Sequence, residues 1–116
     1  MDNFPQNVTD DLRAVLQHAR HESAQRHNVY LDIEHLMLGL LRHAGGTAYL
    51  AFKHFDVDTA ALYEHVAGTV GMERSTPIEL KGYARDATAA LERMQRIAQE
   101  MGHGTLDTGH LLLSLL

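Results

Sequence analysis

Histidine is the side chain in this sequence with the most capacity for chemistry, since nine occur among 116 residues. His18 and His21 are three positions apart, and Glu22 follows directly. On a helix this spacing places both rings on one face, which is compatible with a two-ligand surface site for a metal ion. Two ligands bind a metal weakly, and the sequence indicates no third ligand near them, so we expect no metal site.

Two further histidines, His35 and His110, occupy the same place in two similar segments, EHLMLGLL and GHLLLSLL. Each lies in the first turn of a leucine-rich segment that is predicted to be a helix. A neutral imidazole can donate a hydrogen bond through one nitrogen and accept one through the other. We therefore expect both histidines to be structural, tying the loop that precedes each helix to the helix start.

Other catalytic patterns are missing from the sequence. There is no cysteine, which excludes disulfides, zinc fingers and a thiol nucleophile. No segment matches the P-loop pattern G-x-x-x-x-G-K-S/T, so the chain cannot bind ATP through that motif. Ser23, Ser75 and Ser114 lack the G-x-S-x-G turn of serine hydrolases. We predict that the chain is not an enzyme and uses no cofactor.

Charge and hydropathy limit the possible partners. Fifteen Asp and Glu against ten Lys and Arg give a net charge of −5, and such a surface repels phosphate backbones, so we expect no nucleic-acid partner. The acidic start MDNFPQNVTDD lacks the apolar core of a secretory signal. The longest apolar stretches, LMLGLL and LLLSLL, are too short to cross a bilayer. We predict a cytoplasmic protein with no membrane partner.

The sequence repeats itself at a fixed spacing. His35 and His110 are 75 positions apart, and at the same shift Asp32 aligns with Asp107 without a gap. Such self-similarity indicates a duplicated structural unit. Residues 1–116 are predicted to form a single domain, with repeat one at about 8–70, a linker at about 71–79 and a partial repeat two at about 80–116. Further aligned pairs are Asp11 with Asp86, Ala14 with Ala89, Leu16 with Leu91, Leu31 with Leu106 and Leu36 with Leu111.

Apolar residues recur at helical spacing through both units. The pattern predicts helices after Thr9, at 33–42, 48–54, 59–70, 80–101 and after 107. Leu50, Ala51 and Phe55 are expected to face inward, and Gly39 is expected where another backbone comes close. No segment alternates with period two, so we expect no sheet and an all-α fold. The predicted N-caps are Thr9, Asp32, Thr47, Asp58 or Asp56, and Asp107 or Thr108.

Two segments carry a resemblance to a known family. R-H-N-V-Y-L-D-I-E-H-L-M-L-G-L-L from Arg26 to Leu41 and M-G-H-G-T-L-D-T-G-H-L-L-L-S-L-L from Met101 to Leu116 resemble the L-G-H-N-Y-I/V-G/D-T-E-H-L-L-L-G-L-L block of the Clp N-terminal (Clp-repeat) domain. The resemblance implies a helical bundle of two pseudo-symmetric repeats. The family domain usually has two more helices after the second block, so repeat two is expected to be truncated here.

The resemblance also implies a function. In the family, this domain stands at the N-terminus of AAA+ Clp unfoldases and recruits protein substrates and adaptor proteins. Some members bind phosphorylated arginine, and Thr9 and Glu34 match the positions that hold it, while Ala84 and Gly109 replace them in repeat two. The alternative is that Thr9 is only an N-cap and Glu34 only an acidic residue in the first turn of its helix.

Two functional hypotheses follow. In the first, the chain recruits substrates or adaptors to an AAA+ ring, in cis or in trans. In the second, it is a stand-alone regulatory or oligomerising protein that docks on a partner through the apolar segment LLLSLL. Amphipathicity suggests a protein-contact surface on the outer face of the first helix and in a cleft between the repeats. The residues of this surface are Gln17, Arg20, His21 and Ala24 on the helix, and Tyr49 and Tyr83 near the cleft.

Overall fold

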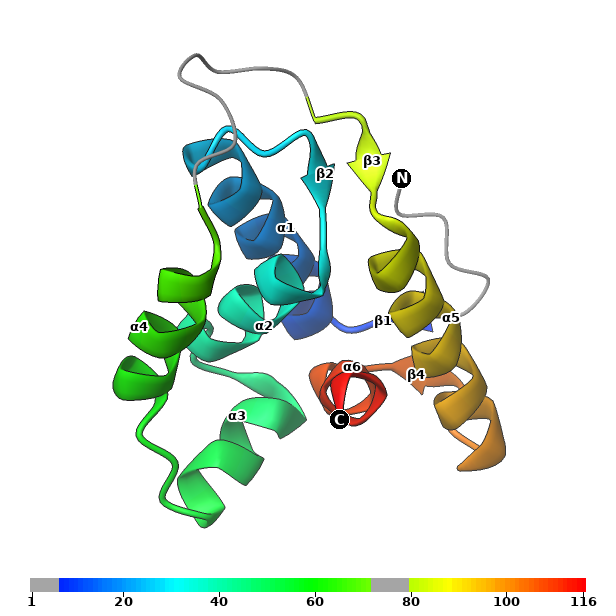
Figure 1. The fold of residues 1–116 in the computed structure, drawn as a ribbon. Helices are drawn as coiled ribbons and strands as arrows, with labels where there is room; N and C mark the ends of the chain where they lie inside the picture. The colour runs from blue at the N-terminus through cyan, green and yellow to red at the C-terminus, as the bar shows by residue number, and fades with distance from the viewer. Residues whose placement is uncertain (1–6, 72–79) are drawn as a thin grey trace.

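The duplication predicted from the sequence is visible in the order of the elements (Figure 1). The computed structural model describes residues 7–71 and 80–116, which form six helices and four two-residue strands. A shift of 75 positions carries β1, α1 and β2 onto β3, α5 and β4, and the start of α2 onto the start of α6. In chain order, the elements are β1 (Asn7–Val8), α1 (Asp10–Gln25), β2 (Tyr30–Leu31), α2 (Ile33–Arg42), α3 (Gly46–His54), α4 (Thr59–Thr69), β3 (Gly82–Tyr83), α5 (Arg85–Glu100), β4 (Thr105–Leu106) and α6 (Thr108–Leu115).

The strands cross between the two repeats, which corrects the expectation of no sheet. β1 pairs in parallel with β4, and β2 pairs in parallel with β3. The residue that follows β1 and the residue that follows β3 each add one hydrogen bond to their strand pair. The Thr9 N–H donates to the Leu106 carbonyl at 2.9 Å, and the Ala84 N–H donates to the Leu31 carbonyl at 2.8 Å. Two-residue strands are too short to produce alternation in a sequence. Each repeat therefore completes a strand pair of the other.

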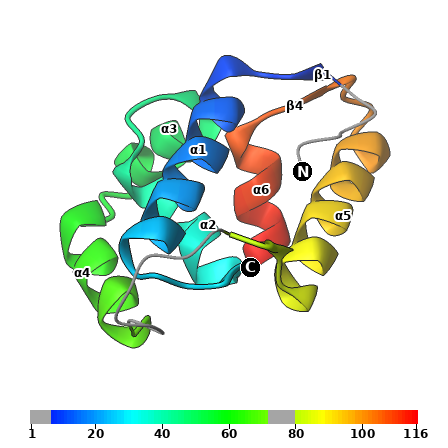
Figure 2. The same cartoon turned by 90° about the horizontal axis from the view of Figure 1, so that it is seen from above.

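The core is formed by apolar side chains, most of them leucine or alanine, mainly from α1, α2 and α5, with Leu111 from α6. Figure 2 shows α6 lying between α1 and α5. Leu36 and Leu111, which align in the repeat, are both fully buried and belong to one core cluster. The predicted close approach at Gly39 is confirmed: a Cβ there would lie 2.6 Å from the Val15 carbonyl oxygen of α1. The repeat thus brings its two leucine-rich helices into a shared core.

The structure differs from the prediction in two helix boundaries and in the exposure of the end of α3. α5 begins at Arg85 and not at 80, because Gly82 and Tyr83 are extended and pair with β2. α3 begins at Gly46 after Gly45, so Thr47 is not its N-cap. Leu50 and Phe55 are 62% and 74% exposed, so neither faces inward as expected.

The other predicted caps and helix ends are supported. Thr9, Asp32, Asp58 and Asp107 are N-caps as predicted. Of the predicted linker at 71–79, all but Gly71 lies outside the described residues. None of the helices described combines the length and the apolar character needed to cross a membrane.

Candidate functional site

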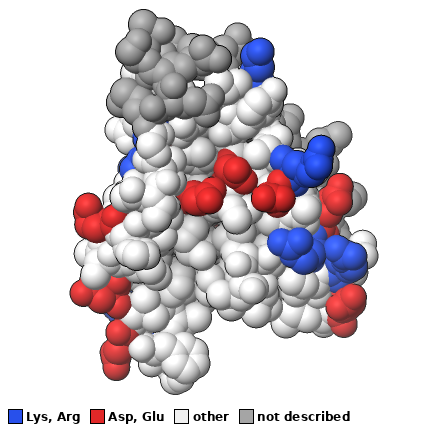
Figure 3. Space-filling model, viewed as in Figure 1, with Lys and Arg blue, Asp and Glu red and all other residues white. Residues whose placement is uncertain are grey.

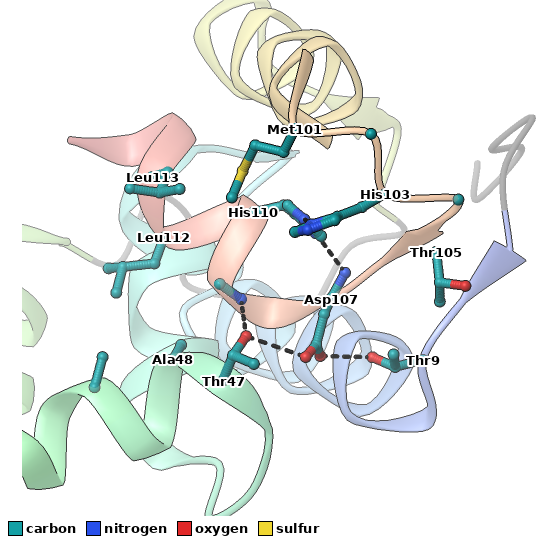
Figure 4. A pocket seen from close by; sticks show the side chains of 14 residues that line it. Thr9, Thr47, Ala48, Met101, His103, Thr105, Asp107, His110, Leu112 and Leu113 are labelled. Carbon is teal, nitrogen blue, oxygen red and sulfur yellow. Dashed lines mark hydrogen bonds between the residues drawn. The ribbon is translucent and has the colours of Figure 1, made fainter. Parts of the chain in front are cut away.

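A cavity of about 700 Å³ opens where α3, α6 and the loop between α5 and β4 meet (Figure 4). Its apolar lining comes from Ala48 and Ala51 of α3, Met101 after α5, and Leu112 and Leu113 of α6. Met101 and Leu113 are each about half exposed, at 51% and 48%. We call this cavity the α3–α6 pocket. Apolar side chains left open to solvent in a concave surface are typical of a ligand or protein contact site.

The polar end of the α3–α6 pocket is organised around Asp107. Its carboxylate accepts hydrogen bonds from the hydroxyls of Thr9 at 2.8 Å and Thr47 at 3.0 Å, and from the Thr108 N–H at 2.8 Å. Burial alone would raise the pKa of Asp107, but these hydrogen bonds hold it below its ordinary value. The carboxylate is therefore ionised and joins α1, α3 and α6 in one network.

The starts of α3 and α6 cap each other through threonine hydroxyls. The Ala48 N–H donates to Thr108 Oγ1 at 3.0 Å, and the Gly109 N–H donates to Thr47 Oγ1 at 2.8 Å. This explains why Thr47 does not cap its own helix: its hydroxyl is used by α6. A Cβ on Gly109 would lie 2.5 Å from Thr47 Oγ1, so this approach also requires a glycine in α6.

A second pocket, of about 470 Å³, is the counterpart of the first in the repeat. Pairs of residues 75 positions apart line the two cavities, and the second also contacts the end of α4. We call it the α2 pocket. In it Asn28, Tyr30, Asp32, Glu34, His35 and Ala84 take the places of His103, Thr105, Asp107, Gly109, His110 and Thr9.

The structure separates the two residues predicted to hold phosphoarginine. Thr9 lines the α3–α6 pocket, while Glu34 lines the α2 pocket. The separation follows from the crossed strands, because β1 places Thr9 beside β4 of the other repeat. Thr9 is also the N-cap of α1, accepting from the Leu12 N–H at 3.1 Å. The α3–α6 pocket therefore contains Thr9 together with Gly109, and the α2 pocket contains Glu34 together with Ala84.

The predicted structural role of His35 and His110 is confirmed. Each ring accepts the backbone N–H of the N-cap residue of its helix through Nδ1, from Asp32 at 2.8 Å and from Asp107 at 2.9 Å. Each aspartate side chain caps the helix in return, so both helices begin with a capping box. Burial is the main cause that lowers the pKa of both imidazoles.

The residues of the predicted protein-contact surface do not form one site. Gln17, His21 and Ala24 are exposed on α1, and Arg20 on the same helix is half-buried. Tyr49 lies on α3, with the Lys53 ammonium 5.4 Å from its ring centroid. Tyr83 lies in β3 and packs against the core. Figure 1 places α3 and β3 at opposite ends of the molecule, so the two tyrosines do not share a cleft.

In the structure, His18 of the candidate metal pair contacts His43 and not His21. Neither His18 nor His21 forms part of a group of three or more ligands, and no such group occurs among residues 7–71 and 80–116. His18 is half-buried, and its Nε2 lies 3.4 Å from Nδ1 of His43, while His21 is exposed. His43 in turn bonds Asp11 through Nε2 at 2.8 Å.

Sequence reasoning missed a buried carboxylate in repeat one. Glu22 is 0% exposed and accepts from the Tyr63 hydroxyl at 2.6 Å, from Arg42 at 3.2 Å and from Arg26. Burial would raise the pKa of Glu22, but the hydrogen bonds from Tyr63 and Arg26 lower it. In sequence, Glu22 differs from a surface acid only in the i, i+4 spacing to Arg26. The network attaches α4 to α1 and α2.

Comparison with known proteins identifies the family of this chain. The family model described as the Clp repeat (R) N-terminal domain matches residues 7–116. The chain belongs to this family. The chain is 27% identical over 108 residues to the chaperone protein ClpB of Oceanobacillus iheyensis. The matched segment covers 93% of the chain and 13% of that protein. The resemblance seen in the repeated leucine-rich blocks is thereby confirmed.

Two further relatives agree with the assignment. ClpC of Staphylococcus saprophyticus, an ATP-dependent Clp protease ATP-binding subunit, is 27% identical over 109 residues, covering 94% of the chain and 13% of that protein. The N-terminal domain of the ClpV1 ATPase from E. coli aligns with a TM-score of 0.78 and 20% identity, over 94% of this chain and 67% of that chain. At this identity the structural match shows the fold alone. The Clp repeat domain spans 13% of the length of both curated relatives.

Proposed function

We propose that this Clp repeat domain is a protein-binding module that recruits protein substrates or adaptors to the ring of an AAA+ Clp ATPase. Family membership supports the role, since the relatives ClpB and ClpC are a chaperone and an ATPase subunit of a protease. The sequence contains no P-loop, so ATP hydrolysis would lie outside these residues. The domain would contribute capture and not chemistry.

The observation that carries the proposal is the apolar lining of the α3–α6 pocket. In Figure 3, the face over α6, between α3 and α5, carries few charged side chains, whereas charged side chains gather over α5. Met101 and Leu113 supply apolar surface that a bound segment could cover. An unfolded protein exposes apolar side chains that its native state buries, so such a pocket suits unfolded segments.

The affinity of this pocket is expected to be weak. Burying one large apolar side chain contributes roughly 1.5–3 kcal/mol, and binding must also offset the loss of ligand freedom. Several domains attached to one ring would raise the effective concentration of a captured chain. Weak reversible capture then suffices, because release toward the ring must follow.

A charge placed in the pocket tests the proposal. Leu113→Asp puts a carboxylate into the apolar lining, and the matched control Leu50→Asp adds the same charge at a 62% exposed leucine of α3 that does not line it. Fluorescence anisotropy would follow the binding of labelled, reduced and carboxymethylated α-lactalbumin, a permanently unfolded protein. We expect L113D to lose about tenfold in affinity, because covering the exposed half of a leucine side chain contributes about that ratio. We expect no loss for L50D. Equal affinities in all three proteins would contradict the proposal.

The second candidate function, docking of a partner on α6, is favoured by a difference between the repeats. Leu38 of α2 is 0% exposed, whereas its counterpart Leu113 of α6 is 48% exposed. Self-association through this face is measurable by sedimentation velocity. A monomer at all concentrations tested would exclude the oligomerising form of the hypothesis.

Binding of phosphoarginine stays a prediction, now for the α2 pocket, which contains Glu34. A carboxylate can hold a guanidinium by charge-assisted hydrogen bonds, and Glu34 supplies one in the α2 pocket. Titration calorimetry with free phosphoarginine, comparing the wild type with Glu34→Ala, tests it. Heat with the wild type that E34A abolishes is expected, and no heat with the wild type refutes the prediction.

A further inference from the structure

His18 of α1 and His43, the residue that follows α2, bring two ring nitrogens close together. Nε2 of His18 lies 3.4 Å from Nδ1 of His43, the ring centroids are 5.4 Å apart, and the ring planes meet at 44°. An ordinary hydrogen bond from an N–H group is shorter, at about 2.7–3.2 Å. Two imidazole nitrogens bound to one tetrahedral Zn²⁺ at about 2.0–2.1 Å lie about 3.3–3.4 Å apart. The separation therefore fits two ligands of one metal ion better than a hydrogen bond between the rings.

A carboxylate sets the tautomer of His43. Nε2 of His43 lies 2.8 Å from Oδ1 of Asp11, and because a carboxylate can only accept, His43 donates its Nε2 proton to it. Nδ1 of the neutral His43 ring then carries the lone pair, on the side of His18. Histidines that bind a metal almost always donate their other ring N–H to a carboxylate or a carbonyl, which fixes the ring and raises its basicity. Asp11 supplies this contact to His43.

A glycine leaves room for the contact between Asp11 and His43. A Cβ on Gly45 would lie 2.6 Å from Oδ1 of Asp11 and 3.3 Å from Nε2 of His43. Gly45 also has a φ of +152°, which residues with a side chain rarely adopt. Both the space and the backbone thus favour glycine at this position, and the Asp11–His43 pair is part of the turn that leads into α3.

The surrounding charges are compatible with a bound cation. Burial is the largest cause that lowers the pKa of His18, and the charge of Arg42 lowers it further, so the ring is neutral at physiological pH and free to coordinate. The Arg42 guanidinium lies 3.2 Å from the carboxylate of buried Glu22, which offsets its positive charge. Asp11 adds a negative charge beside His43.

A second pair of histidines in contact, His103 and His110, lacks this arrangement. Nδ1 of His103 lies 2.8 Å from Nε2 of His110, which is an ordinary hydrogen-bond distance. Nδ1 of His110 accepts the backbone N–H of Asp107, so the proton of His110 is on Nε2, between the rings. In repeat two, Arg93 takes the place of His18, so the arrangement is confined to repeat one.

We propose that Nε2 of His18 and Nδ1 of His43 bind a divalent transition-metal ion of the zinc type, with Asp11 as the positioning residue for His43. Two protein ligands leave the remaining coordination positions to water. Imidazole suits Zn²⁺, Ni²⁺ and Cu²⁺, whereas Mg²⁺ and Ca²⁺ prefer oxygen ligands. The ion joins α1 to the turn before α3, so it stabilises the native fold, which alone holds the two ligands together. The site does not depend on the docking function proposed above.

Titration calorimetry of the whole chain with ZnCl2 tests the site, and MgCl2 is the control cation. We expect Zn²⁺ binding that is lost in both His18→Ala and His43→Ala, and no binding of Mg²⁺. His21→Ala is the matched control, because exposed His21 would be the partner of His18 if helical spacing alone formed the site. It should bind Zn²⁺ like the wild type. Asp11→Asn keeps both ligands and should bind about tenfold more weakly, because removing a carboxylate that holds a ligand costs at least that ratio.

Urea denaturation with and without ZnCl2 shows whether each variant is folded and gives a second readout. Zn²⁺ should raise the denaturation midpoint of the wild type and H21A and leave those of H18A and H43A unchanged. The proposal is overturned if the wild type binds no Zn²⁺, if H18A and H43A bind it as tightly as the wild type, or if H21A loses as much affinity as H18A. Equal affinities of D11N and the wild type would refute the role of Asp11.

Discussion

The crossing of α1 and α2 leads to a prediction about Gly39→Ala. The new Cβ would lie 2.6 Å from the Val15 carbonyl oxygen and 3.1 Å from the Ala19 nitrogen, both backbone atoms of α1. No rotamer change can relieve contacts with backbone, so the helices must separate by about 0.8 Å to restore ordinary contact. Overpacking of this kind costs about 1–3 kcal/mol, and the higher helix propensity of alanine returns up to about 1 kcal/mol. We expect G39A to lower the free energy of unfolding by about 1 kcal/mol.

Gly68→Ala is the matched control for this prediction. Gly68 lies in α4, and a Cβ there would meet no atom within 4 Å. Only the propensity gain remains, so G68A should raise the free energy of unfolding by about 0.5 kcal/mol near a helix end. Urea denaturation followed by circular dichroism measures both variants. The reasoning about close packing is refuted if G39A is as stable as the wild type or if both variants change stability in the same direction.

Two further predictions concern the polar networks. Tyr63→Phe removes a donor from buried Glu22 and should cost about 1.5 kcal/mol at neutral pH. Because the pKa of Glu22 is lowered in the fold, its stabilising contribution is full above the unfolded value of about 4.3 and is lost as the pH falls through the folded value. The deficit of Y63F in urea denaturation should therefore shrink at about pH 3, and a constant deficit contradicts the argument. Asp107→Ala should cost about 1 kcal/mol more than Asp32→Ala, because Asp107 also accepts from two threonine hydroxyls of other elements. Equal thermal unfolding temperatures for the two alanine variants would refute that reasoning.

Local patterns in the sequence predicted much of the fold. The N-caps Asp32 and Asp107 and the structural role of His35 and His110 were predictable, because a helix start depends on residues close in sequence. Gly39 was predictable because a glycine amid leucines in a buried helix indicates a close approach of backbones. These signals act within one or two turns of helix, which is the range that periodicity and capping describe.

Contacts between the repeats were not predictable in the same way. Thr47 has the spacing of an N-cap for its own helix, yet its hydroxyl serves Asp107 and Gly109, which only the tertiary fold brings near. The division of Thr9 and Glu34 between two pockets has the same origin. Repeat one contains both residues in the correct order, but the crossed strands place them in different pockets.

The crossed strands also determine when this domain can complete its fold during synthesis on the ribosome. Thr9 and its partner Asp107 are separated by 98 positions, so the first strand emerges long before the segment that holds it. β2 stays unpaired until residues 82–83 of β3 leave the exit tunnel, and β1 stays unpaired until residues 105–106 of β4 follow. Closing so long a loop is slow relative to forming local helices. A nascent chain halted before residue 105 would thus leave β1 unpaired and expose the core that Leu106 and Leu111 complete.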